Sequence, residues 1–314
     1  MTTPKWTGTN LWRISGLAVA MLALAMPAML RSQSLPAAVV KQRDQLLHEQ
    51  WDPARLYAML SSQDPEASED LYRGAFAAGP AIIGKLEKAL VDDRTAEFAS
   101  QELAWFADAR SMAILQKLLK DPRDLDLRRF YYGALGGADD PGDVEILLNQ
   151  VRNSDHEPDR TVTRNAILAL SVSSDAALAA KLRQVEQQIT DPVIQDDLDT
   201  AAMVVGMRAR YMATPAGKRS GSSVTQAIRS YFMPALQAMP SAGDAGQPSG
   251  VEVNVKNLTW WPDNARVLAA VDFENPEAVA SYQMVLQKNQ AGWKVASVWL
   301  GDEREKPKPP APTK

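Results

Sequence analysis

Apolar residues in the middle of the chain recur with helical spacing and also with a longer period of 32 to 35 residues. Within residues 92–213, one apolar position returns at these intervals, an aspartate follows five residues later, and an apolar stripe begins seven residues after the aspartate. An aspartate suits a helix start because its carboxylate accepts the unpaired amide protons of the first turn. Each unit therefore predicts a helix, a tight turn and a capped helix. The recurring positions are Leu103, Leu135, Leu170 and Val205, then Asp108, Asp140 and Asp175, then Leu115, Leu147 and Leu182.

Two of these units also carry a family resemblance. The segments ALGGADDPGDVEILLNQV and NAILALSVSSDAALAAKL resemble short HEAT repeats of the bilin-lyase type. The resemblance implies a solenoid of stacked helical hairpins, with an arginine near the start of each first helix that pairs with a neighbouring repeat. Arg128, Arg129 and Arg164 lie close to that place. The residues one period before and one period after them, Glu97 and Asp199, are not arginines. We therefore expect a polar ladder that is incomplete at both ends of the array.

The segment before these units is also predicted to be helical. Asp52-Pro53 and Asp64-Pro65 are pairs that open helices, and Gly79-Pro80 predicts a break. The segment fits the repeat period poorly, as expected of a terminal unit with a polar outer face. We interpret residues 37–213 as one HEAT-like helical repeat domain.

A different pattern follows residue 213. The sequence TPAGKRSGSS at 214–223 has no apolar period and predicts a linker, and one amphipathic helix comes next. From residue 251 the apolar period becomes two, which predicts four antiparallel strands at about 251–255, 267–273, 279–288 and 293–300. Residues 224–301 are thus a predicted small α+β domain, and the stretch 302–314, DEREKPKPPAPTK, a predicted disordered tail. The predicted fold class is multidomain and mainly α, with an α-helical solenoid followed by one helix and a four-stranded sheet.

The closing strand GWKVASVWL, after a helix and hairpins, resembles the last strand of cone-shaped nuclear-transport-factor-like or SnoaL-like domains. That resemblance implies a curved sheet with a pocket. Trp293 and Trp299 share strand parity, so we expect both on one face, while the adjacent Trp260 and Trp261 must point to opposite faces. We expect the tryptophans of this domain to fill the core under the helix. The alternative is exposed aromatic contact with a glycan or a partner, in which at least one of this adjacent pair is exposed. Trp260 and Trp261, with Arg128, Arg129 and Arg164, are the candidate binding residues.

The N-terminal residues 1–34 have the pattern of a signal peptide. Lys5 and Arg13 precede an uncharged run at 14–30, and small residues follow it. An uncleaved membrane anchor made of residues 14–30 and a buried helix are the alternatives, and the run is near the lower length limit for a membrane span. We expect an exported protein, periplasmic or secreted, that touches a membrane only if the anchor is retained.

Composition removes several kinds of chemistry. The chain has no cysteine, two histidines and a net charge of −4, so thiolate sites, histidine clusters and a basic nucleic-acid surface are not predicted. No phosphate-binding loop, GxSxG, HExxH or calcium-loop spacing occurs. The sequence predicts no catalytic residue, no metal and no cofactor.

The leading hypothesis is therefore an extracytoplasmic, non-catalytic scaffold whose helical-repeat surface binds a protein or peptide partner. The alternative is a small-ligand-binding or minor enzymatic role of the C-terminal domain, with Asp272, Glu274 or Tyr282 lining a pocket. A third hypothesis, chromophore attachment, is disfavoured by the export signal.

Overall fold

The computed structural model describes residues 35–50, 52–61, 64–121, 125–136, 140–219, 221–238, 252–274 and 278–306. The predicted signal segment 1–34 lies outside the described residues, as does 307–314 of the predicted tail. The predicted fold class is confirmed, because a long series of helices precedes a four-stranded antiparallel sheet. The helices are α1 (Ala37–His48), α2 (Pro53–Leu60), α3 (Pro65–Ala78), α4 (Ile83–Ala89), α5 (Asp93–Phe106), α6 (Ala109–Leu118), α7 (Arg128–Ala134), α8 (Pro141–Arg152), α9 (Arg160–Ser171), α10 (Ala176–Glu186), α11 (Pro192–Met212) and α12 (Val224–Ala238).

The aspartates predicted from the period cap the second helix of each unit. The carboxylate of Asp108 accepts from the Ser111 amide at 2.7 Å and begins α6, and Asp140 and Asp175 begin α8 and α10 in the same way. Asp52 and Asp64, each followed by proline, cap α2 and α3. The predicted helix starts are therefore confirmed.

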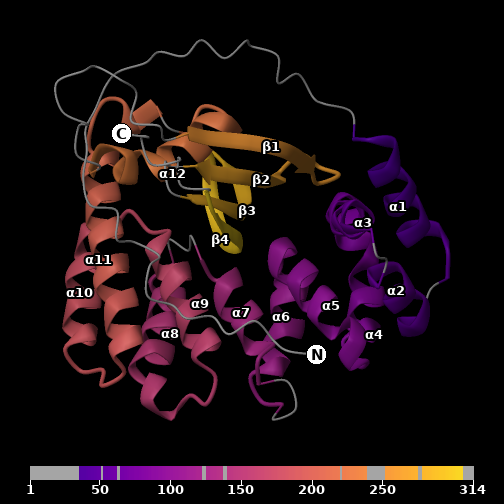
Figure 1. Ribbon diagram of the computed structural model, residues 1–314, viewed down its shortest axis with the longest axis horizontal. Coiled ribbons are helices and arrows are strands. Elements are labelled where there is room, and N and C mark those ends of the chain that lie inside the picture. Colours follow the sequence, from indigo (N-terminus) through magenta and orange to yellow (C-terminus); the bar gives the residue numbers. More distant parts are fainter. Residues whose placement is uncertain are drawn as a thin grey trace, which may run out of the picture.

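The helices from α3 onward form two layers. The helices α3, α5, α7, α9 and α11 pack one on the next as an inner layer, and α4, α6, α8 and α10 lie outside them (Figure 1). The recurring positions Leu103, Leu135, Leu170 and Val205 are all buried. They lie in a single apolar core that continues along the row and also contains Leu115, Leu147 and Leu182. Stacking of successive units thus buries the apolar stripe that one hairpin leaves exposed.

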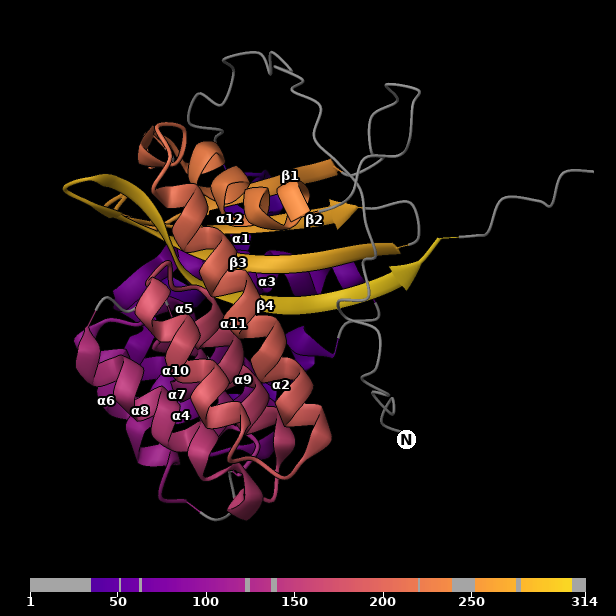
Figure 2. The same cartoon turned by 90° about the vertical axis from the view of Figure 1, so that its left-hand side faces the viewer.

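The sheet is a simple antiparallel meander. Its strands are β1 (Glu252–Trp260), β2 (Arg266–Glu274), β3 (Ala278–Asn289) and β4 (Gly292–Glu305), and they pair in chain order. Val267, Ala269, Val271 and Phe273 of β2 point to the face that α12 covers, whereas Leu268 belongs to the core of the helical layers. One face of the sheet therefore packs on α12, and the other faces the inner helices (Figure 2).

A bulge in β4 overturns the predicted parity of two tryptophans. The pairing runs from Val285 opposite Ser297 to Leu286 opposite Val295, so Ala296 is an extra residue in β4. Trp293 therefore lies on the α12 face, while Trp299 lies on the face toward the inner helices. The expectation that both share a face is wrong because one inserted residue reverses the alternation.

The predicted boundary of the C-terminal domain at residue 301 is also corrected. Strand β4 continues to Glu305, and Glu303, Arg304 and Glu305 pair with Ala280, Val279 and Ala278. Strand pairing uses main-chain groups, so charged side chains are compatible with this exposed edge. The stretch 302–305 is thus part of the sheet and not of a disordered tail.

The predicted linker at 214–223 makes ordered contacts in its described part. A short 3-10 turn spans Gly217–Arg219, and the Gly221 carbonyl accepts a hydrogen bond of 2.6 Å from the Trp293 amide at the start of β4. The connection is therefore attached to the sheet. Among the described helices, none combines the length and the apolar character needed to cross a bilayer.

Candidate binding pocket

The sheet lies against the inner side of the helical arc. The ring of Trp261, directly after β1, packs edge-on against Phe106 of α5 at 5.6 Å between centroids and lies 6.3 Å from Phe76 of α3. At the other side of the sheet, the Trp299 ring lies 6.0 Å from that of Phe130 in α7. The inner side of the helical-repeat surface, which was predicted to bind a partner, is therefore covered in large part by the chain's own sheet (Figure 1).

Polar contacts fix the same interface. The Arg73 side chain of α3 donates to the Thr259 hydroxyl at 3.1 Å, and Asn257 donates to Glu69 at 2.8 Å. Arg266 of β2 reaches the Ala107 carbonyl, where α5 ends, at 3.3 Å. These bonds hold β1 and β2 against α3 and α5.

A pocket of about 420 Å³ remains between the two parts, around the edge strand β4. Inner helices α5, α7, α9 and α11 supply a mainly polar wall, which holds Glu97, Arg129, Arg164, Asp197 and Arg208. Helix α12 and strands β2 to β4 supply an aromatic and aliphatic wall, which holds Phe232, Phe273, Tyr282, Trp299 and Leu300. The volume falls within the usual range for small-molecule sites, about 300–1,000 Å³.

Ion pairs between successive inner helices account for the charged residues of the polar wall apart from Arg208. Glu97 of α5 binds Arg129 of α7 at 2.7 Å, and Arg164 of α9 binds Asp197 of α11 at 2.6 Å. Burial of the Asp197 carboxyl raises its pKa, and the Arg164 guanidinium opposes that rise. The two arginines are therefore paired with acids of α5 and α11, at Glu97 and at Asp197. No arginine stands at position 97 or 199, and the ladder implied by the family resemblance stays a prediction.

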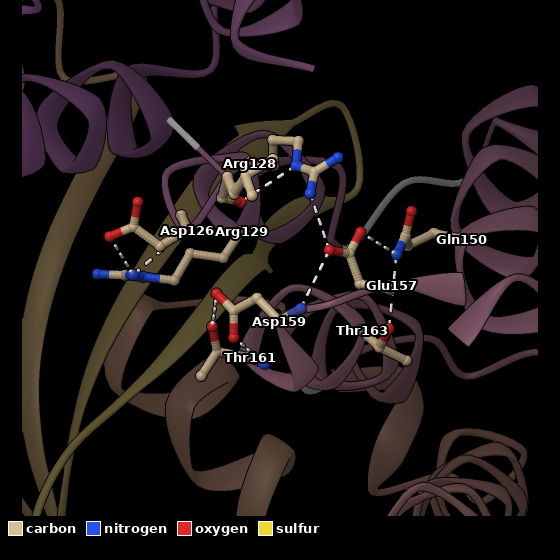
Figure 3. Close-up of polar contacts among 9 residues, drawn as sticks. Asp126, Arg128, Arg129, Gln150, Glu157, Asp159, Thr161 and Thr163 are labelled. Carbon is tan, nitrogen blue, oxygen red and sulfur yellow. Dashed lines mark hydrogen bonds and ion pairs between the residues drawn. The ribbon is translucent and has the colours of Figure 1, made fainter. Parts of the chain in front are cut away.

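Arg128 and Arg129 point in different directions from the start of α7 (Figure 3). Arg128 binds Glu157 at 2.8 Å, and Glu157 also accepts from Gln150 and from the Asp159 amide. Arg128 is absent from the pocket wall and instead connects α7 to the loop before α9. Of the three candidate arginines, Arg129 and Arg164 meet at the pocket and Arg128 does not.

The candidate tryptophans do not line the pocket either. Trp261 is buried against α3 and α5, and Trp260 is half-buried against Trp293 on the α12 face, with 5.4 Å between ring centroids. They do point to opposite faces, as predicted. The alternative in which one of them is exposed is wrong, because each face of the sheet is covered by a helical layer.

Arg208 is a pocket residue that could not be identified from the sequence. It lies in α11 and is 5% exposed, and its guanidinium donates to the carbonyls of Ser171, Ser173 and Tyr231. The guanidinium also lies 4.2 Å from the centre of the Tyr231 ring. Burial lowers its pKa. Helix α11 also holds Arg210, and the sequence gives no signal that distinguishes a buried arginine from an exposed one.

Tyr282 of the candidate set lines the pocket, whereas Asp272 and Glu274 do not. Asp272 is held by Lys256 at 3.0 Å and by the Ser281 hydroxyl at 2.9 Å. Burial raises the pKa of Tyr282, so its hydroxyl stays protonated at neutral pH and can act as a donor.

Comparison with known proteins adds no relative to this picture. No protein-family model matches the chain, and no curated protein matches it. The resemblances to short HEAT repeats and to cone-shaped domains stay predictions, as do export and the signal peptide.

Proposed function

We propose that the protein is a non-catalytic binding protein of the extracytoplasmic space, and that its ligand enters the pocket between the inner helices and the sheet. The single observation that carries the proposal is the composition of this pocket, in which an aromatic and aliphatic wall faces a wall of arginines and acids. Few but well-placed polar groups beside a large apolar surface are typical of sites that bind and orient a ligand.

The charges in the pocket support binding more than catalysis. Glu97 and Asp197 are each held by an arginine, so neither is available as a free general base. The pocket wall also contains no histidine. The third acid of the lining, Glu303, is exposed at the end of β4, whereas apolar surface for contact with a ligand is plentiful.

Nile red, a neutral dye that fluoresces in apolar sites, tests the proposal. Titration into the protein is expected to give saturable binding with one dye per chain. Ala280→Trp and Thr200→Trp, which enlarge residues of the sheet wall and the helix wall, are each expected to abolish it. Ala180→Trp, on the exposed side of α10, is the matched control and is expected to bind normally. Absence of saturable binding, or binding unchanged in both pocket variants, contradicts the proposal.

A protein or peptide partner is the second candidate, and the position of β4 favours it. Strand β4 is the last in the sheet order, and its residues Leu300 and Glu303 line the pocket. An extended peptide can add to such an edge through main-chain hydrogen bonds. A peptide partner recovered from envelope extracts must then compete with Nile red, and a recovered partner that leaves dye binding unchanged contradicts this second candidate.

A further inference from the structure

The three arginines of the pocket differ in whether a carboxylate balances their charge. Arg129 and Arg164 each have a carboxylate partner. Among the described residues Arg208 has none, and its hydrogen bonds go to main-chain carbonyls and to the neutral phenol of Tyr231. Its Nε is buried and has no hydrogen-bond partner. A buried guanidinium of this kind is unfavourable unless an opposite charge comes near it.

The groups around Arg208 hold it in place without neutralising it. Ser171 and Ser173 lie at the C-terminal end of α9, where the helix dipole is negative, and the Tyr231 ring adds a cation–π contact. These are partial charges, so a net positive charge remains beside the apolar wall. Because Arg208 is buried, its charge attracts an anion more strongly than a charge at the surface does.

Resting on the proposed binding function, we infer that the pocket takes a ligand that carries one anionic group on an apolar body, with the anionic group beside Arg208. Tyr231 and Tyr282 line the same pocket. The Tyr231 phenol makes a side-chain hydrogen bond with Arg208, in which its oxygen accepts, and Tyr282 makes none with a described residue, so both hydroxyls keep a proton that they can donate to the anion. Phe232 and Phe273, stacked with 5.3 Å between their centroids, provide the surface for the apolar body.

The remaining acids agree with a single negative charge on the ligand. Glu97 and Asp197 are balanced by their arginines, and Glu303 is exposed at the end of β4. A ligand with several negative charges would meet these acids, whereas a cationic amphipath would lie beside Arg208 and be repelled. A monoanionic amphipath satisfies both conditions.

Calorimetric titration of the full chain with decanoate, decanol and decyltrimethylammonium tests the inference, with all three kept below micellar concentration. Decanoate is expected to bind about tenfold or more tightly than decanol, because a hydrogen-bonded charge pair contributes at least that ratio. Decyltrimethylammonium is expected to bind most weakly. Added salt should weaken the binding of decanoate and leave the binding of decanol unchanged.

The variant Arg208→Gln tests whether the anionic group binds beside Arg208. The variant is expected to bind decanoate no better than decanol, with decanol affinity retained to within about threefold, a change of less than about 0.7 kcal/mol. Arg183→Gln on the exposed side of α10 is the matched control and is expected to keep the preference for decanoate.

The outcomes separate the inference from the function on which it rests. If neither decanoate nor decanol binds, the proposed function itself fails. If the wild-type protein binds both equally, the ligand class is wrong, and this comparison holds even if Arg208→Gln does not fold. If Arg208→Gln folds and keeps the preference for decanoate, Arg208 does not recognise the anion and serves only to hold α9 and α12 together.

Discussion

The indole ring of Trp299 occupies the place where a Cβ on residue 133 would stand, so that β4 meets α7 at a point that only glycine leaves open. Gly133 lies within α7, one turn after Phe130, whose ring also packs on Trp299. The docking of the sheet on the inner helices thus depends on a missing side chain as much as on the aromatic contact.

Gly133→Ala is expected to lower the free energy of unfolding by about 1–3 kcal/mol, because the added methyl group overpacks this contact. Urea denaturation followed by circular dichroism measures the change. Gly84→Ala on α4 is the control, since a Cβ there meets only the end of the Arg110 side chain at 3.3 Å. The control gains helix propensity and is expected to be neutral or stabilising by up to about 1 kcal/mol. Equal effects of the two variants would contradict the interpretation.

The Arg128–Glu157 ion pair is expected to contribute measurably to stability. Its side chains are only 17% and 7% exposed, and Glu157 has two further donors. A double-mutant cycle with Arg128→Met and Glu157→Gln should give a coupling energy of about 1–3 kcal/mol. The same cycle on Lys117 and Glu87, which are 71% and 43% exposed, should give less than about 1 kcal/mol. Similar values in the two cycles would show that burial does not set the strength of the pair.

Glu102 makes stability depend on pH. Both of its oxygens are buried without a hydrogen-bond partner, and burial raises its pKa well above the usual 4.5. In the unfolded chain the carboxyl releases its proton near pH 4.5, but in the folded chain it keeps the proton to higher pH. Between those two pKa values the unfolded state binds fewer protons, so the free energy of unfolding falls as pH rises, by about 1.4 kcal/mol per pH unit.

Glu102→Gln removes this titration and is expected to stabilise the protein above pH 5, with a gain that grows as pH rises and then levels off. Thermal unfolding of both proteins from pH 4 to pH 8 measures the difference. Glu97→Gln, which changes an acid of the same helix that is exposed and paired, is the control. A difference between Glu102→Gln and wild type that is constant over the pH range would overturn the assignment.

The helix caps offer a test of the repeat register. Asp175→Ala is expected to cost about 1 kcal/mol of stability, because the Ala177 amide loses its acceptor at 2.9 Å. Asp175→Asn should restore most of that loss, since asparagine caps nearly as well. Asp199→Ala, at an exposed interior position of α11, is the control and should be neutral or slightly stabilising. Denaturant midpoints of the three variants decide between a capping role and a general effect of charge.

The elements that could be located from the sequence are those in which a residue type has one common structural role next to its neighbours. Aspartate before an apolar stripe caps a helix, proline after it begins the first turn, and alternation of valines makes a strand, so Asp108, Asp140 and the four strands could be located without a structure. These signals depend only on neighbours along the chain.

The pocket depended on relationships that the linear sequence does not contain. The extra residue Ala296 moves Trp299 to the face toward α7, and a bulge of one residue leaves no compositional trace. Asp197 is the partner of Arg164, and no periodic position singles it out from the neighbouring Asp196 and Asp199. Arg208 became recognisable only when its surroundings were known.

The sheet also limits how this row of helices can change in length. Repeat arrays usually gain or lose whole hairpins, because each unit touches only its neighbours. Here Trp261, after β1, packs on Phe76 of α3, while Trp299 of β4 packs on Phe130 of α7. Duplication or deletion of a hairpin between α3 and α7 would separate one tryptophan from its partner. The spacing of the four strands therefore sets the number of helical units that can lie between α3 and α7.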